Sequence, residues 1–209
     1  MTNGVLGIQA YPTKAVTLPV HAPTNPELVA QADLGYIHCF DYGFVVDDSS
    51  PAAAEGFAKV YSASGVSRCP IKPSLQYAVD LAHLFAVFAA CELMDWPKCQ
   101  DIAKDAELWS LAVAAVKGIQ GLGIHGEVGQ KAASATNEAG LAAWFAAWEK
   151  DTLPLELQEF NRYHHGGKVN AQDHQHLRDC VAAGEAEGKT MTALKTLLKR
   201  VEERDAIPA

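Results

Sequence analysis

A histidine-rich segment toward the C-terminal end of the chain holds its densest group of side chains that can do chemistry. Residues 159–176, EFNRYHHGGKVNAQDHQH, contain four of the eight histidines. Because histidine changes charge near neutral pH, such a segment can transfer protons, bind a metal ion or form a solvated corner. Gly166 and Gly167 are predicted to end one helix and turn the chain, and Asn170 or Asp173 to begin the next helix.

A metal site in this segment would be incomplete. His174 and His176 are two positions apart and point to different sides of a helix, unlike the i, i+4 pair that chelates zinc. The cysteines have no C-x-x-C pair among them and fit reduced, unreactive thiols better than a disulfide framework. They are Cys39, Cys69, Cys91, Cys99 and Cys180. We therefore predict no metal cofactor.

Two other interpretations of the segment stay open. In the first, it is an exposed corner whose helix ends are capped. In the second, it is an acid/base corner in which His165 and His174 transfer protons and further polar side chains bind the substrate. Those substrate-binding side chains would be Asn161, Lys168 and Asp173.

A polar stripe on the most apolar predicted helix is the second group that could do chemistry. Gln76, Asp80 and His83 are spaced i, i+4 and i+7 within residues 74–94, so they share one face of that helix. Polar groups in such a helix need partners. They form either an internal hydrogen-bond network or a site, in which Asp80 and His83 would be catalytic and Gln76 would contact the substrate.

The order of elements predicts a mostly α-helical fold, a multi-helix bundle preceded by a small α/β segment. Residues 1–69 form the α/β segment, with strands over 14–20 and 36–46 and a helix over 49–65. Residues 70–209 form the helical domain. Its helices are predicted over 74–94, 99–123, 137–150, 154–165, 170–188 and 190–204.

Composition narrows the class of protein. The chain has 209 residues, 49% of them hydrophobic, which is enough to bury a core. A net charge of -8 argues against nucleic acid or an anionic membrane as a partner, because both bind clustered Lys and Arg. Residues 1–10 lack the features of a signal peptide and no uninterrupted apolar run is long enough to span a membrane. We predict a cytoplasmic protein.

The helical part of the chain resembles a known domain. The run from LQYAVDLAHLFAVFAACELM through AVKGIQGLGI to GGKVNAQDHQHLRDCVAAGEAEGKTMTALKTLLKRVE resembles the C-terminal helical domain of the ketopantoate reductase family, in the 6-phosphogluconate dehydrogenase-like group. The similarity covers residues 70–202 and rests on helix order, the LGI helix end and the Gly-Lys turn. It implies a helical bundle of that type. In that family an N-terminal Rossmann domain binds NADP, and TNGV near the start of this chain is similar to the turn after its last strand.

The chain departs from that family at the residues that carry its chemistry. No G-x-G-x-x-G motif opens a βαβ unit, so the cradle for a nicotinamide cofactor is missing. The family's catalytic Lys and two Asn residues align with Gln76, Asp80 and Leu84. The resemblance therefore implies ancestry and fold, with residues 1–69 as a remnant of a cofactor domain, and argues against reduction by this chain alone.

Two functions are predicted from these patterns. The first is a cofactor-independent isomerase, lyase or cyclase that acts on a small carbonyl-bearing or cyclic molecule in a pocket between the Gln76 helix and the Gly-Gly corner. The alternative is a non-catalytic ligand-binding module, or the substrate-domain subunit of a split NAD(P)-dependent reductase. Trp144 and Trp148 predict packing in the core or between subunits. The resembled domain often supports dimers, which implies a homodimer.

Overall fold

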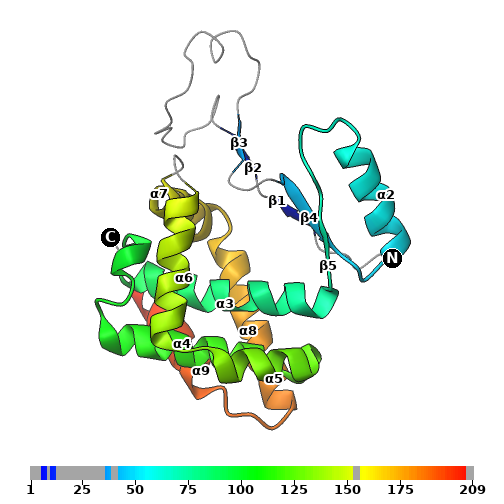
Figure 1. Ribbon diagram of the computed structural model, residues 1–209. Coiled ribbons are helices and arrows are strands. Elements are labelled where there is room, and N and C mark those ends of the chain that lie inside the picture. The colour runs from blue at the N-terminus through cyan, green and yellow to red at the C-terminus, as the bar shows by residue number, and fades with distance from the viewer. Residues whose placement is uncertain (1–5, 9, 13–35, 39–41, 153–155, 206–209) are drawn as a thin grey trace. The chain divides into compact units, whose positions relative to one another are not determined.

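The structure is a computed structural model that describes residues 6–8, 10–12, 36–38, 42–152 and 156–205. For residues 6–8, 10–12 and 36–38, and for residues 82, 83 and 205, it describes the backbone alone. Its described part is mostly helical, with eight α-helices and five short strands (Figure 1). The chain divides into two compact units. The first comprises Met1–Tyr77 and Asp151–Leu157, and the second comprises Ala78–Lys150 and Gln158–Ala209.

The first unit contains the strands. They are β1 (Leu6–Ile8), β2 (Ala10–Pro12), β3 (Tyr36–His38), β4 (Phe44–Asp47) and β5 (Ile71–Lys72). One sheet has the order β1-β4-β5, with β1 antiparallel and β5 parallel to β4, and a second sheet pairs β2 with β3 antiparallel. The predicted strand over 14–20 lies outside the described residues. The predicted strand over 36–46 is found as two, β3 and β4.

Helix α2 (Pro51–Ser62) connects the two parallel strands and closes a small core. Val46 of β4 packs with Ala54 of α2 and with Cys69, all buried. Phe44 and Tyr61 meet edge to face there, with ring centroids 4.8 Å apart. The helix predicted over 49–65 is therefore confirmed, with Pro51 at its first position, where the missing amide N–H costs nothing.

The second unit holds the remaining helices, and all but one were predicted. They are α3 (Ser74–Leu93), whose first turn belongs to the first unit, α4 (Ala106–Gln120), α5 (Gly126–Ala135), α6 (Glu138–Asp151), α7 (Leu157–Tyr163), α8 (Asn170–Ala186) and α9 (Thr192–Asp205). Short 3-10 turns form η1 (Cys99–Asp101) and η2 (Gly123–His125). Helix α5 was not predicted, because its sequence GEVGQKAASA has two glycines and few apolar residues.

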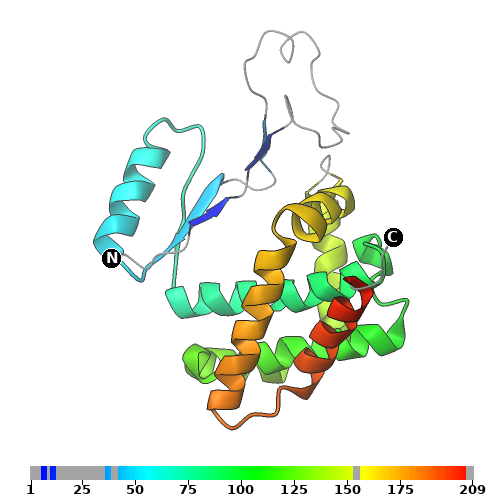
Figure 2. The same ribbon diagram turned by 180° about the vertical axis from the view of Figure 1, so that it is seen from behind.

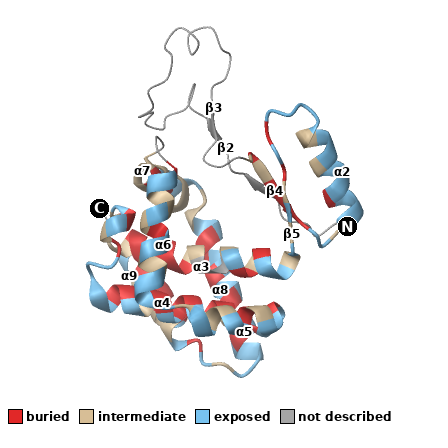
Figure 3. Ribbon diagram, viewed as in Figure 1, coloured by how far each residue is buried: buried red, intermediate tan, exposed pale blue. Residues whose placement is uncertain are grey.

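The core of the second unit forms where helical periodicity places apolar side chains on one face. Leu194, Leu197, Leu198 and Val201 of α9 follow an i, i+3, i+4, i+7 pattern and are all buried. They pack on α4, and α4 begins at Asp105, whose carboxylate accepts a hydrogen bond from the amide of Leu108 at 3.0 Å. Figure 3 shows buried residues along the facing sides of these helices, and Figure 2 shows α8 crossing α3 within this unit.

Helix α3 is the one described helix that is long and apolar enough to cross a membrane by length and composition, with a mean hydropathy of 1.4 over its window. The sequence predicted none. Half of that window is buried inside the structure. Residues 86–91 are continuously buried and Glu92 is bonded to two other helices, so we interpret α3 as a core helix.

Candidate functional site

The histidine-rich segment is a π-helical turn followed by a bend, and the predicted helix end at the two glycines is wrong. His164–Lys168 form the π-helical segment η3 between α7 and α8, and the bend comes at Val169. No positive φ occurs at Gly166, so left-handed backbone is not its role. A Cβ there would lie 2.7 Å from Nε1 of Trp96, whereas one on Gly167 would meet nothing within 4 Å. Gly166 is needed because Trp96 packs against its backbone.

The π-helical turn brings His165 back over the first turn of α8. Its Nδ1 lies 2.7 Å from Oδ2 of Asp173, which is buried. The imidazole stacks on Phe88 of α3 with ring centroids 4.0 Å apart. His164, its neighbour, stacks on Phe160, and burial together with the adjacent His165 lowers the pKa of His164.

Glu92 at the end of α3 is the centre of a second pair. Its side chain is 4% exposed. Its Oε2 lies 2.8 Å from Nε2 of His174 and accepts a hydrogen bond from Asn170 at 3.0 Å. Its Oε1 and its backbone carbonyl accept hydrogen bonds from the guanidinium of Arg204 on α9. The network therefore ties together α3, α8 and α9.

These two pairs make a connected cluster of Glu92, His165, Asn170, Asp173, His174 and Arg204, which we call the histidine–carboxylate cluster. Asn170 joins its halves, because its amide also donates to the carbonyl oxygen of His165 at 3.2 Å. Both carboxylates already accept bonds from side chains of the cluster. This arrangement favours the interpretation of the segment as a satisfied structural corner.

The other predicted site residues are spread over the molecule. Asn161 on α7 is buried, and its Oδ1 has no hydrogen-bond partner among the described residues. Lys168 is exposed. Gln76 and Asp80 on α3 are exposed as well, so the polar stripe is not buried in the bundle as the apolar pattern predicted. The side chain of His83 lies outside the description.

A pocket of about 350 Å³ opens between α3, the segment from the end of α4 through η2, and α8. Its apolar walls come from all three elements: Ala78, Leu81, Phe85, Ile119, Leu122, Ile124 and Ala183. The volume and the apolar character are typical of small-molecule sites. The pocket borders the predicted α3 helix, but its second wall is the middle of α8 and not the Gly-Gly corner.

His125 of η2 lines this pocket with a fixed orientation. Its side chain is 9% exposed, and its Nδ1 lies 3.0 Å from the carbonyl oxygen of Ile119 and 3.2 Å from that of Gln120. Both partners only accept hydrogen bonds, so Nδ1 carries the proton. In the neutral imidazole Nε2 is then the acceptor, and it has no hydrogen bond to a described residue.

His176 of α8 supplies a second imidazole to the same pocket. Its ring packs on Phe85 with centroids 4.6 Å apart, while its outer side is exposed. Its Nε2 lies 3.7 Å from Sγ of Cys180. Partial burial lowers the pKa of His176, Asp179 and Asp173 act in the opposite direction, and the charge of His125 lowers it further. Burial also raises the pKa of Cys180 to about 11, so its thiol stays protonated at neutral pH.

The turn that carries His125 is held by a carboxylate from the end of α8. Both oxygens of Glu187 accept from the amide of Gly123, at 2.8 and 2.9 Å. Residues 121–126, GLGIHG, have the G-x-G-x-x-G spacing, but they follow helix α4 and not a strand. Because the chain's own carboxylate occupies the Gly123 amide, this segment is not a dinucleotide cradle of the kind that opens a βαβ unit.

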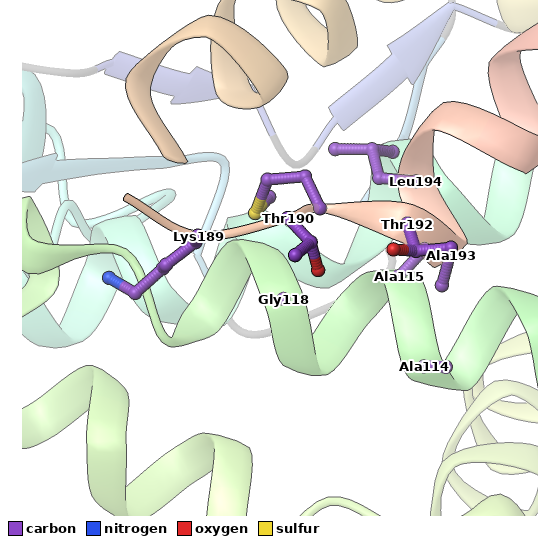
Figure 4. A pocket seen from close by; sticks show the side chains of 9 residues that line it. Ala114, Ala115, Gly118, Lys189, Thr190, Thr192, Ala193 and Leu194 are labelled. Carbon is purple, nitrogen blue, oxygen red and sulfur yellow. The ribbon is translucent and has the colours of Figure 1, made fainter. Parts of the chain in front are cut away.

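A second pocket of about 300 Å³ lies where the chain enters α9. Figure 4 shows Lys189, Thr190 and Thr192 along that segment, beside Gly118 of α4. Lys189 is already paired with Glu187. This pocket offers threonine hydroxyls at a helix start, but its described lining holds no histidine or carboxylate for proton transfer.

Sequence reasoning missed the pocket residues His125, Asp179 and Cys180. A lone histidine in a glycine-rich segment shows no spacing pattern, and its role depends on contacts with residues that the fold brings to it. Among the described residues, no three His, Cys, Asp or Glu side chains are grouped to hold a metal ion. Comparisons with models of known families, with curated proteins and with solved structures find no match.

Proposed function

We propose that the chain is an enzyme that binds a small, largely apolar organic molecule in the α3–η2–α8 pocket and moves a proton on it. The observation that carries this proposal is an apolar pocket of about 350 Å³ with two imidazoles from different elements in its lining. An isomerase, lyase or cyclase acting on a carbonyl-bearing or cyclic substrate needs such groups and no hydride donor.

His176 is the proton-transfer group in this proposal. Its lowered pKa keeps the imidazole neutral at pH 7, so it can accept a proton from a carbon next to a carbonyl. The substrate becomes an enolate and His176 an imidazolium. Return of that proton to another carbon completes an isomerisation, with no change in oxidation state. Because its outer side is exposed, His176 can also exchange its proton with water.

The experiment is a screen for hydrogen exchange at carbon that requires no knowledge of the substrate. Small cyclic and aryl-alkyl ketones, with and without a hydroxyl group, are incubated with the protein in D2O, and loss of the proton signal next to the carbonyl is followed by NMR. We expect at least one ketone to exchange faster with the wild-type chain than with His176→Gln. The rate should fall as the pH drops through the lowered pKa of His176, because the protonated imidazole cannot accept a proton.

A matched variant controls for folding. His164→Gln changes another histidine whose pKa is lowered by burial, but this one contacts Phe160 and does not line the pocket. It should exchange at the wild-type rate. Equal rates for wild type and His176→Gln across the whole panel would contradict the proposal.

Binding without catalysis is the second candidate function. It is favoured by the lining, in which apolar side chains outnumber the polar ones. A ketone that binds to the pocket but shows no exchange would support a ligand-binding module. The fold type of the ketopantoate reductase family, the homodimer, a split reductase and a cytoplasmic location stay predictions. They are supported by the resemblance, by the helical bundle and by the half-exposed Trp144.

A further inference from the structure

The orientation of His125 restricts what can bind beside it. We infer that the ligand of the α3–η2–α8 pocket is an uncharged, largely hydrocarbon molecule that donates a hydrogen bond from a hydroxyl group to Nε2 of His125. This inference rests on the proposed function, because it concerns the same pocket, and it adds the substrate class.

The backbone contacts of His125 fix which of its ring nitrogens donates and which accepts a hydrogen bond. Nδ1 of His125 donates to the carbonyl oxygens of Ile119 and Gln120, at 3.0 and 3.2 Å. These carbonyls belong to the last turn of α4, and that of Ile119 also accepts a hydrogen bond from the amide of Leu122 at 3.1 Å. Moving the proton to Nε2 would place a lone pair against two carbonyl oxygens. Neutral His125 therefore offers the pocket an acceptor and no donor.

The second step concerns the polar group of the ligand. A hydroxyl group satisfies the Nε2 acceptor, whereas a methoxy oxygen or a ketone oxygen cannot, since neither has a proton to donate. A ligand without the donor would remove water from Nε2 and leave it without a partner. The free energy lost when a buried acceptor has no partner is the usual reason that an apolar pocket binds a ligand with the donor much more tightly than one without it.

The third step concerns charge. Asp179 lines the same pocket, and its carboxylate also accepts a hydrogen bond from Gln175 at 2.8 Å. None of the described residues that line the pocket is a Lys or an Arg. A carboxylate ligand would therefore meet one negative charge and no positive one. Ile124, which is 75% exposed, and Phe85 offer hydrocarbon surface that an apolar ring or chain can cover.

Three matched probes test the inference: 4-propylphenol, 4-propylanisole and 4-propylbenzoate. They share one hydrocarbon body and differ in having a donor, only an acceptor, or a negative charge. Binding is measured by titration of the ¹H–¹⁵N spectrum of the wild-type chain at neutral pH. We expect the phenol to bind about tenfold more tightly than either of the others, with shifts centred on Leu122, His125 and Cys180.

A variant and a direct measurement sharpen the test. In His125→Phe the ring remains but the acceptor is lost, so the preference for the phenol over the anisole should disappear. If that variant does not fold, ¹⁵N NMR of the wild-type imidazole gives the same information, with the proton expected on Nδ1 of His125. Equal or tighter binding of the anisole or the benzoate, or a proton on Nε2, would overturn the inference.

The outcomes separate this inference from the proposed function. A preference for the phenol without hydrogen exchange at carbon would support the ligand class and contradict catalysis. Exchange at carbon with no preference among the probes would support catalysis and contradict the ligand class. Failure of all three probes to shift the pocket resonances would contradict both, because both depend on an open apolar pocket at this place.

Discussion

The histidine–carboxylate cluster and the α3–η2–α8 pocket both contain histidines and carboxylates, but they differ in how far the histidine nitrogens are hydrogen-bonded. In the cluster, His165 and His174 each lie within 2.8 Å of a carboxylate, and the Glu92 carboxylate is held by three side chains. In the pocket, Nε2 of His125 has no hydrogen bond to a described residue, and most of the residues that line the pocket are apolar. A satisfied polar network stabilises a fold, whereas an unfilled acceptor beside an apolar cavity is ready for a ligand.

If the cluster is structural, removal of the Glu92 carboxylate should lower the free energy of unfolding more than a substitution at Gly166 or at the surface residue Glu202. Glu92→Ala removes the carboxylate that pairs with the buried His174 and with Arg204 and that accepts a hydrogen bond from Asn170. Because Arg204 is 40% exposed, we expect a loss of about 3 kcal/mol in the free energy of unfolding, at the low end for a broken buried pair. Urea denaturation followed by circular dichroism measures it.

Glu202→Ala is the matched control, since Glu202 pairs with Arg178 on the surface at 3.0 Å. It should cost less than about 1 kcal/mol. Similar losses for Glu92→Ala and Glu202→Ala would show that the cluster contributes little to the fold.

The contact between the π-helical turn and Trp96 should give the next largest effect. In Gly166→Ala the new methyl group would lie 2.7 Å from Nε1 of Trp96, whose side chain is buried. The turn or the indole must shift, which costs about 1–3 kcal/mol. Gly167→Ala, with nothing within 4 Å of the new methyl group, should change stability by less than about 0.5 kcal/mol. Thermal unfolding of the two variants compares them, and equal midpoints would refute the close packing.

In the α3–η2–α8 pocket, the contact of Glu187 with the turn that carries His125 should have a smaller and local effect on stability. Its carboxylate holds the amide of Gly123 and so the turn that carries His125. Glu187→Ala should speed hydrogen exchange of that amide, while Glu185→Ala, which loses only the exposed pair with Lys195, should not. NMR-detected exchange of the Gly123 amide gives the comparison. Equal protection in the two variants would mean that Glu187 does not hold the turn.

The same contact has a pH dependence of known sign. The Lys189 ammonium, followed by the Gly123 amide, lowers the pKa of Glu187 below its ordinary value. A lowered pKa in the folded state means that the contact stabilises the turn above the ordinary Glu pKa and is lost as the pH falls through the lowered one. Protection of the Gly123 amide should decrease in that acidic range.

Local patterns predicted the elements well, and the fold-dependent contacts poorly. The stripe of Leu194, Leu197 and Val201 depends on residues close in sequence, so helix α9 could be predicted. The helix predicted over 99–123 begins later, after its N-cap Asp105. The bond between Glu92 and His174 spans 82 positions, and no spacing rule reveals it. Two adjacent glycines indicated a turn, but the close approach of Trp96 explains Gly166 better.

The site was predictable only in part for the same reason. Histidine density directed attention to residues 164–176, where the imidazoles of His165 and His174 have partners in the structure. His125 stands alone in the sequence, and its tautomer is set by carbonyl oxygens of α4. An acceptor without a partner in an apolar wall becomes visible only when the three walls are assembled.

The most direct test of the central claim compares one histidine from each region. His176→Gln and His165→Gln are assayed side by side for hydrogen exchange at carbon in D2O, with the ketone that the wild-type chain exchanges fastest. If His176 is the proton-transfer group, exchange is lost in His176→Gln and kept in a folded His165→Gln. Loss in His165→Gln with wild-type exchange in His176→Gln would contradict it and place the chemistry in the histidine–carboxylate cluster.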